Sequence, residues 1–473
     1  MEGKNDVALR HLYSRAGFGL SASEYEKRKG HPVAQVVDQL FAEAGNYTEL
    51  RIDKELHPPK YYAKDMMAKL SPDERKELRK QSVADEATMN AMWMDKMTVD
   101  EGVLREKMTF FWHGHFACRN EVALYAQNLN NTLRKNALGN FGDLLLAVSK
   151  DPAMLLYLNN QQNKKQSPNE NFAREVMELF TIGRGNYTEE DVKNGAKAFT
   201  GWAADGEGNF IVRPKQHDDG LKTFMGHTGN FDGEDILKII LSRKETARFI
   251  AAKAYRYFVN QENPDDAIID ELGAVFYASD YNISTLMQHI FKADWFYDPK
   301  NMGNRIKSPV ELLVGMKRDF KIVFEKPEVV VGVQRLLGQV LFNPPNVSGW
   351  AGGRSWIDSS SLLYRMKIPE AILMGSGMDA SIKDDPIENM RMNAINKRIL
   401  KNMKCEVDLG YYTIKYKGKT NEEIVEDISR NFLGSGANDN NKSLVLKFVN
   451  NTGDDPVKAA MMRVCSLPEY QLC

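Results

Sequence analysis

Apolar residues recur at helical spacing along most of the chain, and six stretches carry the signals that begin a helix. In each, a side-chain oxygen can accept hydrogen bonds from the free backbone N–H groups of the first turn. Acidic residues in that turn favour the positive end of the helix dipole, and several stretches place proline at the first helical position. The six begin at Ser21, Ser71, Asp151, Thr188, Ser308 and Thr420. This pattern predicts a mainly α-helical protein.

Three stretches depart from the helical pattern. Residues 209–226 hold two short β-prone runs on either side of the turn-forming letters HDDG, which predicts a hairpin. Residues 405–419 alternate apolar and polar positions between glycines, which indicates another small strand pair. Residues 342–356, FNPPNVSGWAGGRSW, are too rich in glycine and proline for a helix and too aromatic for a disordered linker. We expect an ordered loop there, packed on the body of the protein.

The chain is long enough for one large helical domain with insertions or for two or three domains. A stretch typical of an exposed connection runs from about residue 375 to residue 385. We therefore expect residues 1–375 to form a main helical domain that carries the candidate chemistry. Residues 376–473 should form a C-terminal helical subdomain that includes the second strand pair and packs on the main domain.

Composition narrows the classes of function. Lys and Arg number 63 against 64 Asp and Glu, and a formal charge of −1 gives no reason to expect a nucleic acid or an anionic membrane as partner. The four cysteines are far apart and form no CxxC pattern, which argues against a disulfide framework or a thiolate zinc site. The longest apolar run, at residues 153–158, is too short to cross a bilayer, and no export signal is visible. We expect a soluble protein, cytoplasmic as written and periplasmic or exported if a signal peptide has been removed.

The letters NENFAREVMELFTIG, residues 169–183, predict a short amphipathic helix. Its polar side holds Glu170, Asn171, Arg174, Glu175 and Glu178. If this side faces water, the glutamates and the arginine form exposed ion pairs of only about 0.2–0.5 kcal/mol each. If it faces a cavity, Glu175 and Glu178 suit an acid/base pair or carboxylate metal ligands, while Asn169, Asn171 and Arg174 suit substrate binding. Both interpretations stay open.

The letters WHGHF, residues 112–116, place two histidines two positions apart. If residues 104–116 form a continuous helix, His115 lies on the apolar side and His113 about 200° away, so one metal ion cannot bind both. If Gly114 ends the helix, the two rings can point the same way and bind a metal ion together. We expect a buried, hydrogen-bonded His115 and a polar or active-site position for His113.

The HDDG stretch supplies His217, Asp218 and Asp219, which suit metal binding or general acid/base catalysis. Asp-Gly is also typical of a tight hairpin turn, so we assign Asp219 to the turn. The turn alone does not explain His217 and Asp218, which remain catalytic candidates, with His217 also a candidate metal ligand. His227 in the next loop is a weaker candidate.

The loop at residues 342–356 offers Asn346, Trp350, Arg354 and Trp356 on a stiff backbone. Exposed tryptophans stack on sugar faces and arginine binds carboxylate or sulfate in a bidentate manner, so these four suit a glycan-type substrate. The alternative is a structural loop whose tryptophans fill the core. Arg15 and Lys307 are two further cations near turns, and we expect a structural role for each.

Several separated stretches together resemble the bacterial family known as domain of unknown function 1800. They are HLYSRAGFG, LREKMTFFWHGHF, DPAMLLYLNN, PNENFAREVMELFTIGRGNYTEEDV, RIKSPVELLVG and LGQVLFNPPNVSGWAGGRSWI. The resemblance implies a mainly helical fold and no established activity. Members look like exported or envelope-associated bacterial proteins, often encoded beside sulfatase-like proteins, which implies glycan processing and a sulfatase-like partner. This sequence departs from many relatives in lacking an export signal.

Two hypotheses of function follow. The first is a hydrolase acting on a carbohydrate or a related polar polymer. In its metal-dependent version one divalent ion, bound by His113, His217 and one of Glu175 or Glu178, activates water. In its metal-free version Glu178 and a partner carboxylate act as acid and base. The second hypothesis is a non-catalytic protein that binds a glycan or a partner protein. No GxSxG, Walker, GxGxxG or HExxH motif is present, which disfavours the common nucleotide-using and esterase classes.

Overall fold

The computed structural model describes residues 2–375, 377–378, 398 and 400–473. These residues are mainly α-helical, as the sequence predicts, and contain three small two-stranded sheets where one or two hairpins were expected. The boundary expected near residue 375 lies beside residues 376 and 379–397, which are outside the described part of the chain.

All six helix starts predicted from the sequence are confirmed. Ser21, Ser71, Asp151, Thr188, Ser308 and Thr420 each accept a backbone N–H bond from the first turn of the helix that follows. Four of them form complete capping boxes, in which the third helical residue bonds back to the cap. Such caps are local, which is why the sequence alone is enough to place them.

In the N-terminal half of the chain, α1, α3, α5 and α7 pack against the buried helix α6. The helices of this half are α1 (Glu2–Ala16), α2 (Ala22–Arg28), α3 (Val33–Glu43), α4 (Lys64–Lys69), α5 (Pro72–Met97), α6 (Val103–His115), α7 (Ala123–Asn136), α8 (Phe141–Ser149), α9 (Pro152–Tyr157), α10 (Asn171–Glu175) and α11 (Glu189–Ala198). Residues 103–113 of α6 are all buried, including its charged residues. A helix that is buried on all sides must satisfy its charges inside the protein. Glu106 accordingly binds Arg134, and Lys107 binds Glu311.

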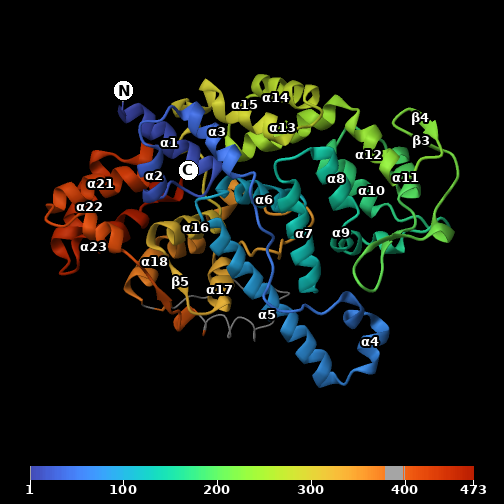
Figure 1. Cartoon of the computed structure of the whole chain (residues 1–473), viewed down its shortest axis with the longest axis horizontal. Helices are drawn as coiled ribbons and strands as arrows, with labels where there is room; N and C mark the ends of the chain where they lie inside the picture. Colours follow the sequence, from blue (N-terminus) through green and yellow to red (C-terminus); the bar gives the residue numbers. More distant parts are fainter. Residues whose placement is uncertain (1, 376, 379–397, 399) are drawn as a thin grey trace.

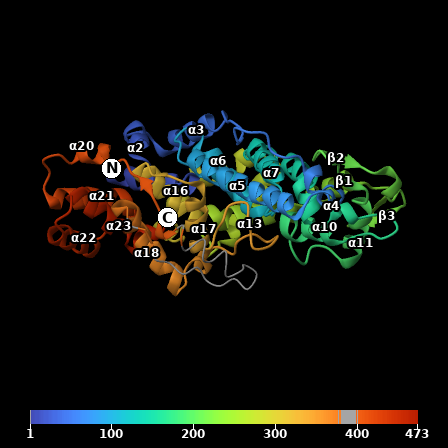
Figure 2. The same ribbon diagram turned by 90° about the horizontal axis from the view of Figure 1, so that it is seen from below.

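The remaining helices extend the body and form its C-terminal end. They are α12 (Gly233–Leu241), α13 (Lys244–Phe258), α14 (Asp266–Ala278), α15 (Ile283–Lys292), α16 (Pro309–Phe320), α17 (Pro327–Leu337), α18 (Ser359–Met374), α20 (Gly410–Lys415), α21 (Asn421–Leu433), α22 (Asp439–Asn451) and α23 (Pro456–Cys465). Figures 1 and 2 show an elongated molecule with α21, α22 and α23 at one end, beside α1 and α2. The strands β1 to β4 lie at the other end.

The strand pairing differs from the prediction at both β-prone stretches. β1 (Trp202–Ala204) pairs with β2 (Phe210–Val212), and β3 (Lys222–Phe224) pairs with β4 (His227–Gly229). The HDDG letters therefore connect two separate hairpins, and the predicted hairpin that turns at Asp219 is wrong. Each strand instead pairs with its nearest β-prone neighbour, since a short connection loses less chain entropy on closure.

The strand pair predicted at residues 405–419 is also wrong. β6 (Cys405–Glu406) pairs with β5 (Val323–Phe324), and residues 410–415 form helix α20. This pairing joins the C-terminal part of the chain to the main body. A second link is Arg10, whose guanidinium donates to the carbonyl and side-chain oxygens of Asn431 at 3.0 and 2.7 Å.

Candidate functional site

The helix at residues 169–183 changes its winding halfway. α10 continues as a π-helix over Val176–Thr181, and the apolar residues Phe172, Val176 and Phe180 are buried. Glu178 accepts hydrogen bonds from Arg184 Nε at 2.5 Å and from the Tyr187 hydroxyl at 2.8 Å. Its two oxygens are therefore already bonded within the same segment.

The other polar residues of this helix make equally local contacts. Arg174 binds Glu170 and Glu189 at 3.0 and 2.7 Å. Glu175 is half-buried, and burial, together with the charge of Glu178, raises its pKa. Asn169 accepts from the backbone of Asn171, and the Asn171 amide donates to the Leu158 carbonyl. The polar side is mainly a set of ion pairs at the surface, with Glu175 as the exception.

The two histidines of WHGHF point to different parts of the core. α6 runs without a break through Gly114 to His115, so the arrangement in which Gly114 ends the helix is wrong. His115 Nε2 lies 3.0 Å from the Phe180 carbonyl oxygen, as expected of a buried, hydrogen-bonded histidine. His113 Nε2 accepts the Phe342 backbone N–H at 3.1 Å. Burial lowers the pKa of both rings, that of His113 to about 3.

The polar or active-site position expected for His113 is wrong. Its side chain packs against Trp93 and Trp350, with ring centroids 5.1 and 5.7 Å away. The helical wheel places His113 away from the apolar side of the helix, but α6 has no exposed side over residues 103–113.

The loop at residues 342–356 packs on the body of the protein, as predicted, and the structure places it against α6. Gly349 has a φ of 72°, and a Cβ there would lie 2.5 Å from the Gly114 carbonyl oxygen, so this close approach requires glycine. Trp356 is buried, so its ring cannot stack on a ligand from solution, contrary to the substrate-binding prediction. Trp350 is half-buried.

The remaining two candidates of this loop lie at the surface. Arg354 and Asn346 are exposed. The Arg354 guanidinium lies 3.3 Å from Glu262, and Asn346 accepts the Ser348 backbone N–H.

The HDDG loop wraps around a buried ammonium group. Lys222 Nζ donates to the carbonyl oxygens of Asp218 and Gly220 at 2.6 and 2.9 Å. The Asp218 carboxylate accepts the Gly220 backbone N–H, which makes it a turn-forming group. His217 Nδ1 lies 2.9 Å from the Thr200 carbonyl oxygen. A carbonyl can only accept, so Nδ1 carries the proton and Nε2 is left as the basic nitrogen.

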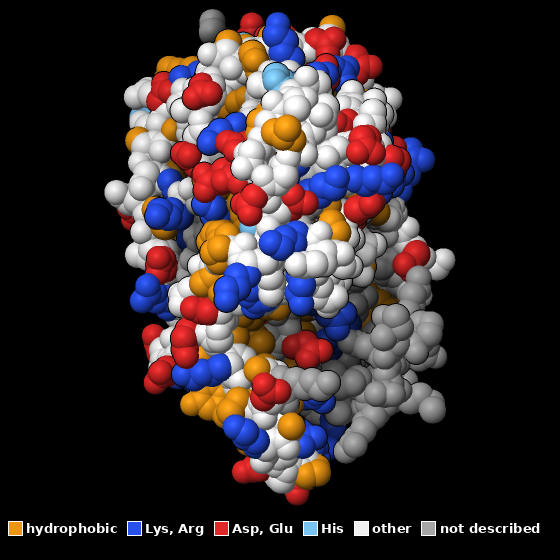
Figure 3. All heavy atoms as spheres, turned by 90° about the vertical axis from the view of Figure 1, so that its right-hand side faces the viewer, with side chains coloured by type: hydrophobic (Ala, Val, Ile, Leu, Met, Phe, Trp, Pro, Cys, Tyr) orange, Lys and Arg blue, Asp and Glu red, His pale blue; other side chains and the backbone are white. Residues whose placement is uncertain are grey.

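His217 lines a small cavity of about 160 Å³ at the hairpin end of the molecule. Trp202 and Phe210 form its aromatic wall, and Asp232 and Glu234 add carboxylates. The Lys150 ammonium lies 2.5 Å from Glu234 and 5.4 Å from the centre of the Phe210 ring. Figure 3 shows this end with basic and acidic side chains intermixed over its surface.

The predicted residues therefore do not converge. His113 and His115 lie in different parts of the core, Glu178 is bonded to Arg184 and Tyr187, and His217 lines a separate cavity. Among the residues that the structure describes, no three or more His, Cys, Asp and Glu side chains are arranged to hold a metal ion. The metal set of His113, His115, His217 and Glu178 is thus not assembled.

A larger site lies at the opposite end, between the main body and the C-terminal helices. Three adjoining cavities, of about 260, 30 and 440 Å³, form a row that we call the boundary groove. Arg10, Leu20 and Phe432 line both the first cavity and the small one, whereas Tyr411 and Tyr412 line both the small one and the third. Asp319 lines all three cavities.

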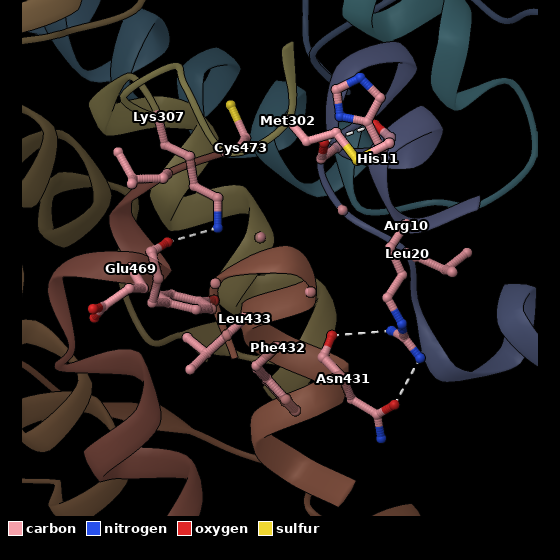
Figure 4. Close-up of a pocket in the computed structure, with 18 of the residues that line it drawn as sticks. Arg10, His11, Leu20, Met302, Lys307, Asn431, Phe432, Leu433, Glu469 and Cys473 are labelled. Atoms are coloured by element: carbon pink, nitrogen blue, oxygen red, sulfur yellow. Dashed lines mark hydrogen bonds between the residues drawn. The ribbon is translucent and has the colours of Figure 1, made fainter. Parts of the chain in front are cut away.

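The first cavity, which we call the deep end, is lined by both positively and negatively charged side chains. In Figure 4, Lys307 Nζ donates to the backbone carbonyl oxygen of Tyr470, 2.8 Å away, and Arg10 donates to Asn431. Lys107 and Glu311 form a buried ion pair at the cavity wall, and Arg305 bonds to the same carboxylate. Burial raises the pKa of Asp319 to about 7 despite the nearby charge of Lys307.

Sequence reasoning missed most of this groove. Arg10, His11, Lys107 and Asp319 were not singled out, and Lys307 was assigned to structure. A signal was present, since the stretches HLYSRAGFG, LREKM and RIKSPVELLVG all contribute to the deep end.

No helix in the described part of the chain combines the length and the apolar character that crossing a membrane requires. Searches of curated proteins and of solved structures found no match to this chain. A family model matches residues 11–472, nearly the whole chain. The chain therefore belongs to the family described as Protein of unknown function (DUF1800).

Proposed function

We propose that the protein binds an extended polar polymer, of carbohydrate type, in the boundary groove. The observation that carries this proposal is the row of three adjoining cavities that meet at Asp319. Ligand sites commonly lie between domains or subdomains and enclose about 300–1,000 Å³. The three cavities together have this size, and their arrangement side by side along shared walls suits a chain better than a compact molecule.

The lining of the groove suits a ligand rich in hydroxyl groups. The ring of Tyr411 is 40% exposed and stands at an edge-to-face angle to Tyr412, 5.1 Å away. The third cavity also presents Asp100 and Arg318, which are bonded to each other at 2.7 Å. Sugar hydroxyls both donate and accept hydrogen bonds, and sugar faces pack on aromatic rings. Such a wall offers both kinds of contact.

Titration calorimetry with a panel of neutral and charged oligosaccharides tests the proposal. Replacing Tyr411 by alanine should weaken binding about tenfold, because the exposed ring is lost. Ile414→Ala is the matched control, since Ile414 is 79% exposed on the same helix and does not line the groove. Binding of unstructured peptides but of no oligosaccharide, or equal affinities for the two variants, would contradict the proposal.

Hydrolysis of the same class of polymer at the His217 cavity is a second candidate function. It is favoured by the tautomer of His217, whose Nε2 can take a proton from water beside Asp232 and Glu234. The cavity is small, so it suits the end of a chain. Hydrolysis at the His217 cavity needs no metal ion. Asp232 and Glu234 would take the catalytic role that the sequence suggested for Glu175 and Glu178.

Reducing-end release from the best-bound polymer tests this second candidate. His217→Gln should lower the rate about 100-fold or more, as expected for loss of a general base. His227→Gln is the matched control, because His227 is exposed in the next hairpin. Equal rates for the two variants would rule out His217 as the base.

A further inference from the structure

We propose that the deep end of the boundary groove binds an oxyanion group, a carboxylate, sulfate or phosphate, through Lys307, Lys107 and Arg10. The inference rests on the proposed function, since it names the chemistry of the polymer that the groove takes. A polymer that carries such groups would place one of them at the deep end and its sugar rings along Tyr411.

Positive side chains outnumber their carboxylate partners at this point. Arg10, Lys107 and Lys307 line the cavity, and the buried Arg305 and Arg15 belong to the same electrostatic cluster. Within the described chain, Glu311 is the carboxylate that pairs with both Lys107 and Arg305. One carboxylate therefore serves two buried cations, while Arg10 and Lys307 donate to uncharged oxygens of Asn431 and Tyr470.

Several donors of the cluster lack a partner. Arg15 is fully buried, and its Nε and Nη1 make no hydrogen bond within the described part of the chain; the same holds for Nε of Arg305. His11 also lines the cavity, but its ring donates to the Phe296 backbone, so the unbonded Nε2 carries no proton and offers an anion no donor. Neither arginine lines the cavity, so their unbonded donors do not themselves hold a ligand, but both guanidinium groups add positive charge behind its wall.

Negative groups also lie within this cluster. Burial lowers the pKa of Lys107, Lys307 and Arg15, that of Arg15 to about 10. Glu311 and a negative charge at Cys473 act in the opposite direction and raise the pKa of Arg305. Two further carboxylates, Asp319 and Glu469, line the deep end, and Oε2 of Glu469 is buried without a hydrogen bond among the described residues. Asp319 has a pKa near 7 and so carries only part of a negative charge at neutral pH.

Lys307 is the best position for a direct test. Its ammonium projects into the cavity and has one hydrogen-bond partner, the Tyr470 carbonyl, besides the Tyr470 ring at 4.1 Å (Figure 4). An ammonium has three donors, so two remain for an anion. Lys300 lies seven residues away, is exposed and does not line the cavity. Lys300→Gln therefore removes the same charge without touching the site.

The experiment is titration calorimetry of the full chain with inorganic phosphate, sulfate and acetate, with chloride keeping the ionic strength constant. We expect one saturable site for at least one of these anions. Comparing the titrations with phosphate, sulfate and acetate shows which class of oxyanion the site binds. Lys307→Gln should weaken this binding about tenfold or more, as expected for the loss of a charge-assisted hydrogen bond. Lys300→Gln should leave it unchanged, and Lys307→Arg should retain it, which separates loss of charge from loss of fold. No binding beyond chloride, or equal binding by Lys307→Gln and Lys300→Gln, would overturn the inference.

Failure of this inference differs from failure of the proposed function. If neutral oligosaccharides bind the groove and Lys307→Gln binds charged and neutral chains as the unmodified protein does, the oxyanion site is refuted and polymer binding stands. If phosphate, sulfate or acetate binds through Lys307 but no oligosaccharide binds, the oxyanion site is supported and the carbohydrate proposal is refuted.

Discussion

Replacing Glu311 by glutamine should destabilise the protein strongly. Glu311, Lys107 and Arg305 are 4, 1 and 6% exposed, and the carboxylate is bonded to both cations. Glutamine keeps the shape and can still accept the Ser308 backbone N–H, which Glu311 accepts at 2.8 Å. The change therefore removes the charge while leaving two buried cations unpaired. Breaking a buried ion pair in this way costs about 3–5 kcal/mol.

Urea denaturation, followed by circular dichroism, measures this loss against total stabilities of about 5–15 kcal/mol for typical domains. Glu234→Gln is the comparison variant: Glu234 pairs with Lys150 at the surface, where a pair contributes about 0–1 kcal/mol. Adding Lys107→Met to Glu311→Gln should restore about 1 kcal/mol or more, because one unpaired buried cation is removed. A loss below about 1 kcal/mol for Glu311→Gln would refute the view that Lys107 and Arg305 are shielded from water.

Three further predictions concern single residues and metal dependence. Burial raises the pKa of Asp151 from 3.8 to about 7, so the folded state binds its proton more tightly than the unfolded state and stability falls as pH rises from about 4 to 7. This pKa difference between the two states corresponds to a loss of stability of roughly 4 kcal/mol at most. Urea denaturation at pH 8 should therefore find Asp151→Asn more stable than the unmodified protein. The reverse order would contradict the raised pKa of Asp151. His113→Leu should cost about 1–3 kcal/mol in the same assay, because the buried Phe342 N–H loses its acceptor; no loss would show that this bond is absent in solution. Chelation with EDTA should leave the melting temperature unchanged, since His113, His115, His217 and Glu178 do not assemble; a clear drop, reversed by one divalent ion, would restore the metal-dependent hypothesis.

Features that depend on local chemistry were predictable from the sequence. The six helix caps each involve a side chain and a backbone N–H two or three residues later, so neighbouring letters suffice. The loop at residues 342–356 was recognised because its composition excludes a helix. The ion pairs around Arg174 follow from i,i+4 spacing, although its second partner, Glu189, lies on the next helix.

Features that depend on distant packing were not predictable. The helical wheel of residues 104–116 separates His113 from His115 correctly, but it cannot show that other elements cover every side of α6. The alternation at residues 405–419 suggested a local hairpin, whereas β6 pairs with β5 about 80 residues away in sequence. The boundary groove joins Arg10 to Asn431 across 421 positions, a separation that no local pattern reports.

The most direct test of polymer binding in the boundary groove is a structure of the protein with its best-bound oligosaccharide. We expect the chain to lie along Tyr411, to pass Asp319 and to end near Arg10 and Lys307, with an anionic group there if the ligand carries one. An oligosaccharide bound at the His217 cavity, or elsewhere on the surface, with the groove left empty would contradict the account.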